Sequence, residues 1–190
     1  MRASRRVLVI ALAFLSSFAA AQQSDQVIAE RVLGPQWKQL SRRAGMIFAG
    51  TVLTAVIPTA ATDRAVPGVT PAVQLSFRVE RAIAGVERGQ ILTIHEWAGA
   101  WSMHRPMRSG QHILIFLYPP SRLDFTSPVG GSLGQVALDP SGKNVSKNAQ
   151  KPVAAIGLRN ESSVRPRVPV DTGSISVVQL ERAIRSAREE

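Results

Sequence analysis

Residues 97–108 bring together side chains that could bind a partner. This stretch, WAGAWSMHRPMR, contains Trp97 and Trp101 together with Arg105 and Arg108. Tryptophan and arginine dominate the energetics of protein interfaces, and loops on a rigid scaffold commonly carry function. One hypothesis is that Trp101 and Arg105 project from this excursion and contact a partner. The alternative is that both tryptophans close one end of the fold as a hydrophobic plug.

The residues that catalysis or metal binding would need do not occur in the required patterns. His95 and Glu96 are not followed by the second histidine of an H-E-x-x-H zinc motif. His95, His104 and His112 are too widely spaced to indicate a metal site. No Gly-x-Ser-x-Gly motif occurs, and the glycine-rich residues 130–134 lack the Gly-Lys-Ser/Thr ending of a phosphate-binding loop. We therefore predict no metal, no cofactor and no catalytic residue.

Alternating apolar and polar residues predict a β-rich scaffold around the excursion. The clearest strand covers 72–83, where the odd positions from 73 to 79 are apolar, as one buried face requires. Gly50 within a strand over 46–57 indicates a bulge or a tight barrel bend. The other predicted elements are strands over 90–97, 112–118 and 135–138, and a short helix over 35–44.

Residues 174–190 have the pattern of an amphipathic C-terminal helix. Ser176 and Gln179 match a capping box, which satisfies two backbone N–H groups at a helix start. Residues 139–173 are rich in Pro, Gly, Lys and Asn, and we interpret them as an extended segment. Residues 22–34 are expected to form a flexible N-terminal segment.

These elements predict a mostly β protein, a small OB-like antiparallel barrel over 35–138 with a short N-terminal helix and a C-terminal amphipathic helix. The strand phases also predict which side chains form the barrel interior. The predicted core consists of Phe48, Val52, Val73, Leu75, Phe77, Val79, Leu92, Ile94, Leu114 and Phe116.

Residues 1–21 are typical of a cleaved secretory signal peptide. Arg2, Arg5 and Arg6 precede an apolar run that is too short to span a membrane, and alanines at 19–21 suit a signal peptidase. We expect an exported product, periplasmic or extracellular, that begins near Gln22 and has no transmembrane segment. The chain has no cysteine, which excludes disulfides and a lipid anchor attached through cysteine.

Three stretches of the predicted strands carry a family resemblance. They are residues 43–52 (RAGMIFAGTV), 75–80 (LSFRVE) with Gly85 after them, and 110–117 (GQHILIFL). Together they resemble the netrin-like, metalloproteinase-inhibitor-like (TIMP-like) OB-fold domains of exported bacterial proteins. The resemblance implies an OB-like barrel and protein binding. Animal inhibitors of this family chelate the protease zinc through an N-terminal cysteine, so their inhibitory chemistry does not carry over to a chain without cysteine.

The net positive charge of the chain favours a class of binding partner but does not identify one. The chain has 23 basic and 13 acidic residues, and without residues 1–21 its formal charge is +7. This excess favours acidic partners, or it serves only to keep the protein in solution. We expect an exported, non-catalytic binding module that engages a protein or cell-envelope component through residues 97–108.

Two alternatives to this function stay open. One is an OB-like binder of an acidic polymer, either nucleic acid or an anionic glycan. Nucleic acid is disfavoured because aromatic residues make up only 5% of the chain and the strand over 72–83 has no row of stacking side chains. The other alternative is an enzyme of unknown type.

Overall fold

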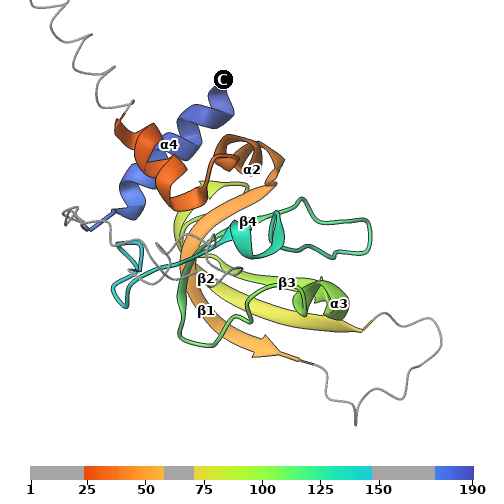
Figure 1. Ribbon diagram of the computed structural model, residues 1–190. Helices are drawn as coiled ribbons and strands as arrows, with labels where there is room; N and C mark the ends of the chain where they lie inside the picture. Colours follow the sequence, from red (N-terminus) through yellow and green to blue (C-terminus); the bar gives the residue numbers. More distant parts are fainter. Residues whose placement is uncertain (1–23, 58–70, 147–173) are drawn as a thin grey trace, which may run out of the picture.

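One antiparallel sheet organises the protein. The computed structural model describes residues 24–57, 71–146 and 174–190 (Figure 1). Within them the sheet has the strand order β3-β2-β1-β4-β5, which confirms the mostly β class. The signal peptide predicted at 1–21, and residues 147–173 of the predicted extended segment, lie outside the described residues. The strands are β1 (Met46–Val56), β2 (Ala72–Ala84), β3 (Ile91–Trp97), β4 (His112–Leu117) and β5 (Gln135–Ala137).

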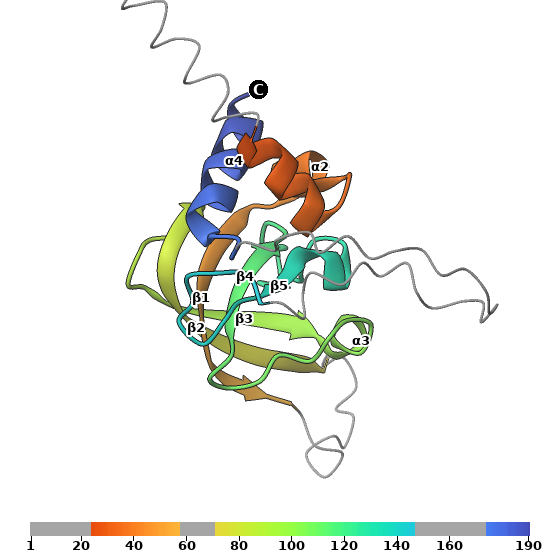
Figure 2. The same cartoon turned by 60° about the vertical axis from the view of Figure 1, so that its left-hand side comes forward.

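Helices cover one end of the sheet. α2 (Trp37–Arg43), α4 (Val177–Glu189) and a helix over 24–33 lie together there, whereas the single turn α3 (Ala98–Trp101) lies at the opposite end (Figures 1 and 2). A short 3-10 helix, η1 (Gly131–Gly134), precedes β5. Within the described residues, no helix combines the length and apolar character that crossing a bilayer requires.

The helix over 24–33 corrects the expectation of a flexible segment at 22–34. Its buried face carries Ala29 and Leu33, with Ile28 and Val32 half-buried beside them. At its start, the Asp25 carboxylate lies 3.1 Å from Nε of Arg182 on α4. A helix this short is marginal on its own, so packing against α2 and α4 is what stabilises it.

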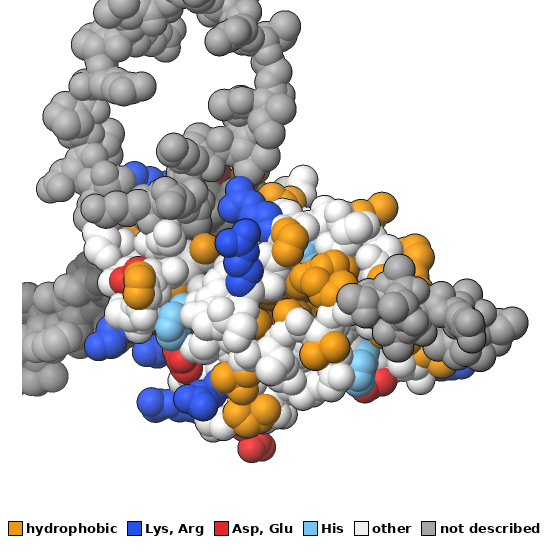
Figure 3. Space-filling view, turned by 90° about the horizontal axis from the view of Figure 1, so that it is seen from below, with side chains coloured by type: hydrophobic (Ala, Val, Ile, Leu, Met, Phe, Trp, Pro, Cys, Tyr) orange, Lys and Arg blue, Asp and Glu red, His pale blue; other side chains and the backbone are white. Residues whose placement is uncertain are grey.

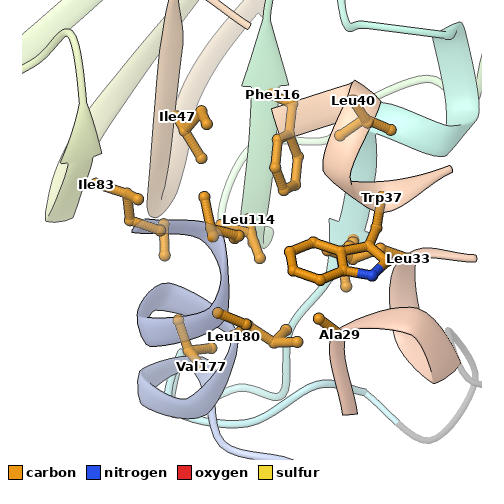
Figure 4. Packing of buried hydrophobic residues seen from close by; sticks show 14 of the residues in the cluster. Ala29, Leu33, Trp37, Leu40, Ile47, Ile83, Leu114, Phe116, Val177 and Leu180 are labelled. Atoms are coloured by element: carbon orange, nitrogen blue, oxygen red, sulfur yellow. The ribbon is translucent and has the colours of Figure 1, made fainter. Parts of the chain in front are cut away.

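The sheet separates two apolar cores, and β4 contributes to both. The first, the helix-covered core, lies between the sheet and the helices and includes Trp37, Leu114, Phe116 and Leu180 (Figure 4). The second, the inner core, lies on the opposite face and comprises Met46, Phe48, Val52, Val73, Leu75, Phe77, Val79, Ile94, Trp101, Met107, Ile113, Ile115 and Leu117.

This division corrects the predicted core. Nine of the ten predicted residues are buried, whereas Leu92 is half-buried. Leu114 and Phe116, however, pack under the helices and not with the other eight. Because β4 is apolar on both faces, its sequence predicts a central strand but leaves open which face meets which core.

β1, whose alternating side chains face both cores, is strongly irregular. Its register with β2 shifts at three places, and one of them lies between Ala49 and Gly50, where a bulge or a bend was predicted. A side chain at Gly50 would collide with the carbonyl oxygen of Arg78 on β2, so only glycine allows this close approach of the two strands.

The sheet is not closed into a barrel by its own strands. A loop after β4 spans part of the gap between β4 and the free edge of β3. Within it, the Tyr118 N–H donates to the Ser127 carbonyl at 3.0 Å, and the Thr126 N–H donates to the His95 carbonyl at 2.9 Å. His95 and Phe125 also form an isolated parallel bridge. The predicted antiparallel sheet is therefore present, with strand-like contacts at its open side.

The start of α4 is as predicted from its capping box. The Val178 N–H donates to the Ser176 hydroxyl at 3.2 Å, and the Ser176 N–H donates to Oε1 of Gln179 at 3.2 Å. The apolar face of the helix, including Leu180 and Ile184, is buried in the helix-covered core. Farther along α4, Nη1 of Arg188 donates to the Ala44 carbonyl at 2.8 Å, which ties the helix to the end of α2.

Candidate functional site

The excursion predicted at residues 97–108 is a compact loop between β3 and β4. It begins with the α3 turn and returns along β1, where the Gly110 N–H donates to the Val52 carbonyl at 2.8 Å. Beside this bond, the Ser109 hydroxyl donates to the Leu53 carbonyl at 2.6 Å. The loop is thus fixed to the sheet at both ends, so its side chains have defined positions.

Three buried side chains at intervals of three residues hold the loop against the inner core. Trp101, His104 and Met107 have exposed fractions of 7%, 8% and 3%. The Trp101 indole packs edge-on against the His104 imidazole, with ring centres 5.3 Å apart. Trp101 therefore does not project from the excursion. It occupies the plug position that the sequence left as the alternative.

A buried carboxylate lies beneath this loop. Glu96 on β3 follows Ile94 on the inward face of the strand and has no exposed surface. Its Oε1 accepts a hydrogen bond from Nε2 of His104 at 2.7 Å. Its Oε2 has no hydrogen-bond partner among the described residues. A charged group buried this deeply needs a partner, and His104 supplies one across the loop.

The second nitrogen of His104 has a partner in either protonation state. Nδ1 lies 2.9 Å from Nε2 of Gln135 on β5 and 3.2 Å from the carbonyl oxygen of Arg105. In the neutral imidazole, Nδ1 accepts from the Gln135 amide. In the imidazolium, Nδ1–H donates to the Arg105 carbonyl, and the Gln135 amide must then turn its oxygen toward the ring.

The surroundings of His104 favour its charged form. Burial by itself lowers the pKa of a histidine, and here it is the largest single effect. The hydrogen bond to Glu96, the bond to the Arg105 carbonyl and the attraction of the Glu96 charge together outweigh it, so the pKa of His104 lies above 6.5. The pair is therefore an ionic clasp that holds the loop to β3.

This clasp is not placed for catalysis. The side chains of His104 and Glu96 are 2% and 0% exposed, so a substrate cannot reach either group in this conformation. Within the described residues, no group of three His, Asp or Glu side chains is arranged to hold a metal ion. The sequence patterns indicated neither a catalytic nor a metal-binding role for Glu96 and His104, and they did not reveal that the two residues pair. The available signal was that Glu96 continues the inward phase of Leu92 and Ile94.

The outer side of the same loop is exposed. Trp97 is 52% and Met103 is 82% exposed, and Arg105 and Arg108 also face solvent. Figure 3 shows hydrophobic side chains grouped on the face at this end of the sheet. The Trp97 indole lies across Gly99, where an added Cβ would be 2.6 Å from the ring. Three of the four predicted binding residues are therefore accessible, and Trp101 is not.

A second, partly buried polar cluster joins three strands of the sheet. The Thr51 hydroxyl contacts Oε1 of Glu80 at 2.5 Å and Nδ1 of His112 at 3.1 Å. These residues come from β1, β2 and β4, and Gly142 covers the Glu80 and His112 side chains. The hydroxyl donates to the carboxylate and accepts from the imidazole, so the three groups satisfy one another and link three strands.

Comparison with known proteins adds no relative. No family model matches the chain, and no curated protein or solved structure matches it significantly.

Proposed function

We propose that the protein is an exported, non-catalytic binding module that engages a protein or cell-envelope component through the outer side of residues 97–108. The observation that carries this proposal is the division of the loop into two sets of side chains. Trp101, His104 and Met107 are buried. Trp97, which precedes them, and Met103, which lies between Trp101 and His104, are exposed. A loop backbone held this firmly loses little further conformational freedom on binding, so the entropic cost is confined to the exposed side chains.

Arginine and tryptophan on one rigid loop form an anchor pair of the kind that dominates interfaces. Arg105 and Arg108 make no salt bridge within the described residues, so both guanidinium groups are available to an acidic partner. Met103 adds apolar surface beside them.

Export and an OB-like architecture are part of the same proposal. The arginines, apolar run and alanines of residues 1–21 support a cleaved signal peptide. The contacts of residues 118–127 across the open side of the sheet support an OB-like half-closed barrel of the netrin-like kind. The loop between β3 and β4 then lies at one end of the barrel, as a binding loop on a scaffold would.

The test is capture from a native envelope fraction by the mature protein, starting at Gln22. The variant W97A/R105A/R108A should lose at least about tenfold in capture, since each such anchor contributes on the order of 1–2 kcal/mol. The matched control is V27A/R31A/R88A, which removes one exposed apolar side chain and two exposed arginines outside the excursion. Equal capture by both variants would overturn the proposal.

Salt separates the remaining alternatives in the same assay. Binding to an acidic polymer weakens steeply as salt rises because counterions are released on binding. Binding to a protein that includes contacts to Trp97 weakens much less. Capture that disappears between low and physiological salt would favour the acidic-polymer function over the proposed one.

A further inference from the structure

A second exposed loop lies beside the end of β3. The turn over 121–125 follows β4, and its Asp124 Oδ2 lies 3.6 Å from Nδ1 of His95 on β3. Phe125 forms a bridge with the same histidine. Leu123 at the tip of this turn is 76% exposed. His95 and Trp97 point to the same face of β3, so the turn lies on the side of the strand from which the excursion starts. We consider the turn and the excursion together as one surface.

This surface combines protruding apolar tips with unpaired basic side chains. Met103 on the excursion and Leu123 on the turn are among the most exposed apolar side chains of the described residues. The excursion contains Arg105 and Arg108 and no acidic residue, and the turn adds Arg122 together with the exposed carboxylate of Asp124, so arginines outnumber carboxylates by three to one. None of these arginines forms a salt bridge within the described residues.

We propose that this surface docks on an anionic lipid bilayer, which deepens the proposed function and rests on it. The tryptophan lies at the level of the headgroups, the two apolar tips enter the boundary of the acyl chains, and the guanidinium groups bind lipid phosphates. We call the docking residues the lipid-facing edge; they are Trp97, Met103, Arg105, Arg108, Leu123 and Arg122.

The shape of the edge favours a bilayer over a protein partner. Met103 and Leu123 stand out from two separate loops, and a protein would need a complementary pocket for each of them. A bilayer takes up protruding apolar side chains without such pockets. The positive charge of the edge complements anionic headgroups, and the chain beyond residue 21 has the same sign of charge, +7.

The tryptophans provide a direct readout of docking. Trp37 and Trp101 are 3% and 7% exposed, whereas Trp97 is 52% exposed, and the chain has no other tryptophan. Insertion of the edge should shift the emission of the mature protein to shorter wavelength. It should also make that emission sensitive to quenchers attached to the acyl chains. W97F should bind and lose this response.

The experiment is sedimentation of the mature protein with phosphatidylcholine vesicles, with or without phosphatidylglycerol. We expect binding only when the anionic lipid is present. M103S/L123S should reduce the partition coefficient by about tenfold or more, because two apolar side chains no longer insert. The control V27S/V178S removes two exposed apolar residues from helices at the opposite end of the sheet and should bind as the unaltered protein does. R105A/R108A/R122A should lose about fivefold per arginine.

Binding to the vesicles through charge alone would give a different pattern among these variants. If the basic protein adhered nonspecifically, M103S/L123S would bind like its control and the Trp97 emission would not shift, which would overturn the lipid proposal. Absence of vesicle binding would overturn it too. Capture of a detergent-extracted envelope protein that depends on Trp97, Arg105 and Arg108 would then leave the binding module intact, whereas failure of both assays would overturn both proposals.

Discussion

At the scale of single residues, the loop between β3 and β4 depends on what lies beneath it. Glu96 and His104 form a buried ion pair, and Trp101 packs against the same imidazole. A buried carboxylate that loses its partner is costly, whereas an exposed side chain on the same loop contributes little to stability. The two sides of the loop can therefore be separated by mutation.

The clasp predicts a pH dependence of stability. The pKa of His104 is raised above 6.5 in the folded protein, so protonation favours folding. The stability that this group contributes is fully present below pH 6.5 and is lost as the pH rises through the folded pKa. Urea unfolding at about pH 5 and at about pH 8 should show this loss.

E96Q is the control for the clasp. Without the carboxylate, burial lowers the pKa of His104, and the contribution of this group should reverse its sign between the same two pH values. The other two histidines are the same in both proteins, so the difference between the profiles isolates the Glu96–His104 pair. Parallel profiles for the two proteins would contradict an ionic clasp.

Substitutions of the two tryptophans on this loop should affect different properties, stability for Trp101 and partner capture for Trp97. Trp101→Ala removes a buried ring from the inner core and should cost about 3–5 kcal/mol in the free energy of unfolding. Trp97→Ala removes a half-exposed ring and should cost less than about 1 kcal/mol while weakening capture. A stability loss for Trp97→Ala as large as that for Trp101→Ala would place both rings in the plug.

At the scale of elements, hydrophobic periodicity predicted where the strands lie, but it predicted less well which core each strand face packs into. β2 was the clearest because one face is buried, and α4 was marked by its capping box. The helix over 24–33 was missed although residues 28, 29, 32 and 33 repeat at helical spacing, because its stability comes from tertiary packing.

The site was predictable only on its outer side. Trp97, Arg105 and Arg108 are polar or amphipathic residues in a loop longer than a hairpin requires, which is a visible signal. The choice between plug and anchor for Trp101 depends on how α3 turns the chain after β3, and sequence patterns do not encode that turn. The Glu96–His104 pair joins residues eight apart on a strand and a loop, so only the fold brings them together.

The bend of β1 gives a prediction at this scale. Gly50→Ala would place a methyl group against the backbone carbonyl of Arg78, and a backbone group cannot move aside as a side chain can. We expect a loss of roughly 1–3 kcal/mol or more in the free energy of unfolding. Gly99→Ala is the comparison, because its methyl group would meet the Trp97 ring, which can rotate away. Similar small losses for both variants would show that β1 can relax.

At the scale of the whole molecule, the helix over 24–33 and α4 come from opposite ends of the described chain and share one core. Arg182 pairs with Asp25 at 3.1 Å, and Lys38 on α2 pairs with Glu190 at 2.8 Å. The sheet end that these helices cover contains Leu114 and Phe116, both fully buried. The N-terminal helix is thus part of the folded domain and not an appendage to it.

This arrangement predicts what a shorter chain loses, beside the start near Gln22 that the proposed signal peptide predicts. We expect exported protein to begin within two residues of Gln22, which leaves the helix over 24–33 complete. A chain starting at Pro35 would expose the surface that Ala29 and Leu33 cover, and two fully buried aliphatic side chains contribute roughly 2–4 kcal/mol. Its free energy of unfolding should therefore be lower by about that amount, and its urea midpoint should fall accordingly. N-terminal sequencing and urea unfolding of the two chains measure this, with Val27→Ser in the full chain as the control because that side chain is 62% exposed. If the shortened chain is as stable as the full one, the helix over 24–33 contributes no burial energy to the domain. That result would support the expectation of a flexible segment at 22–34.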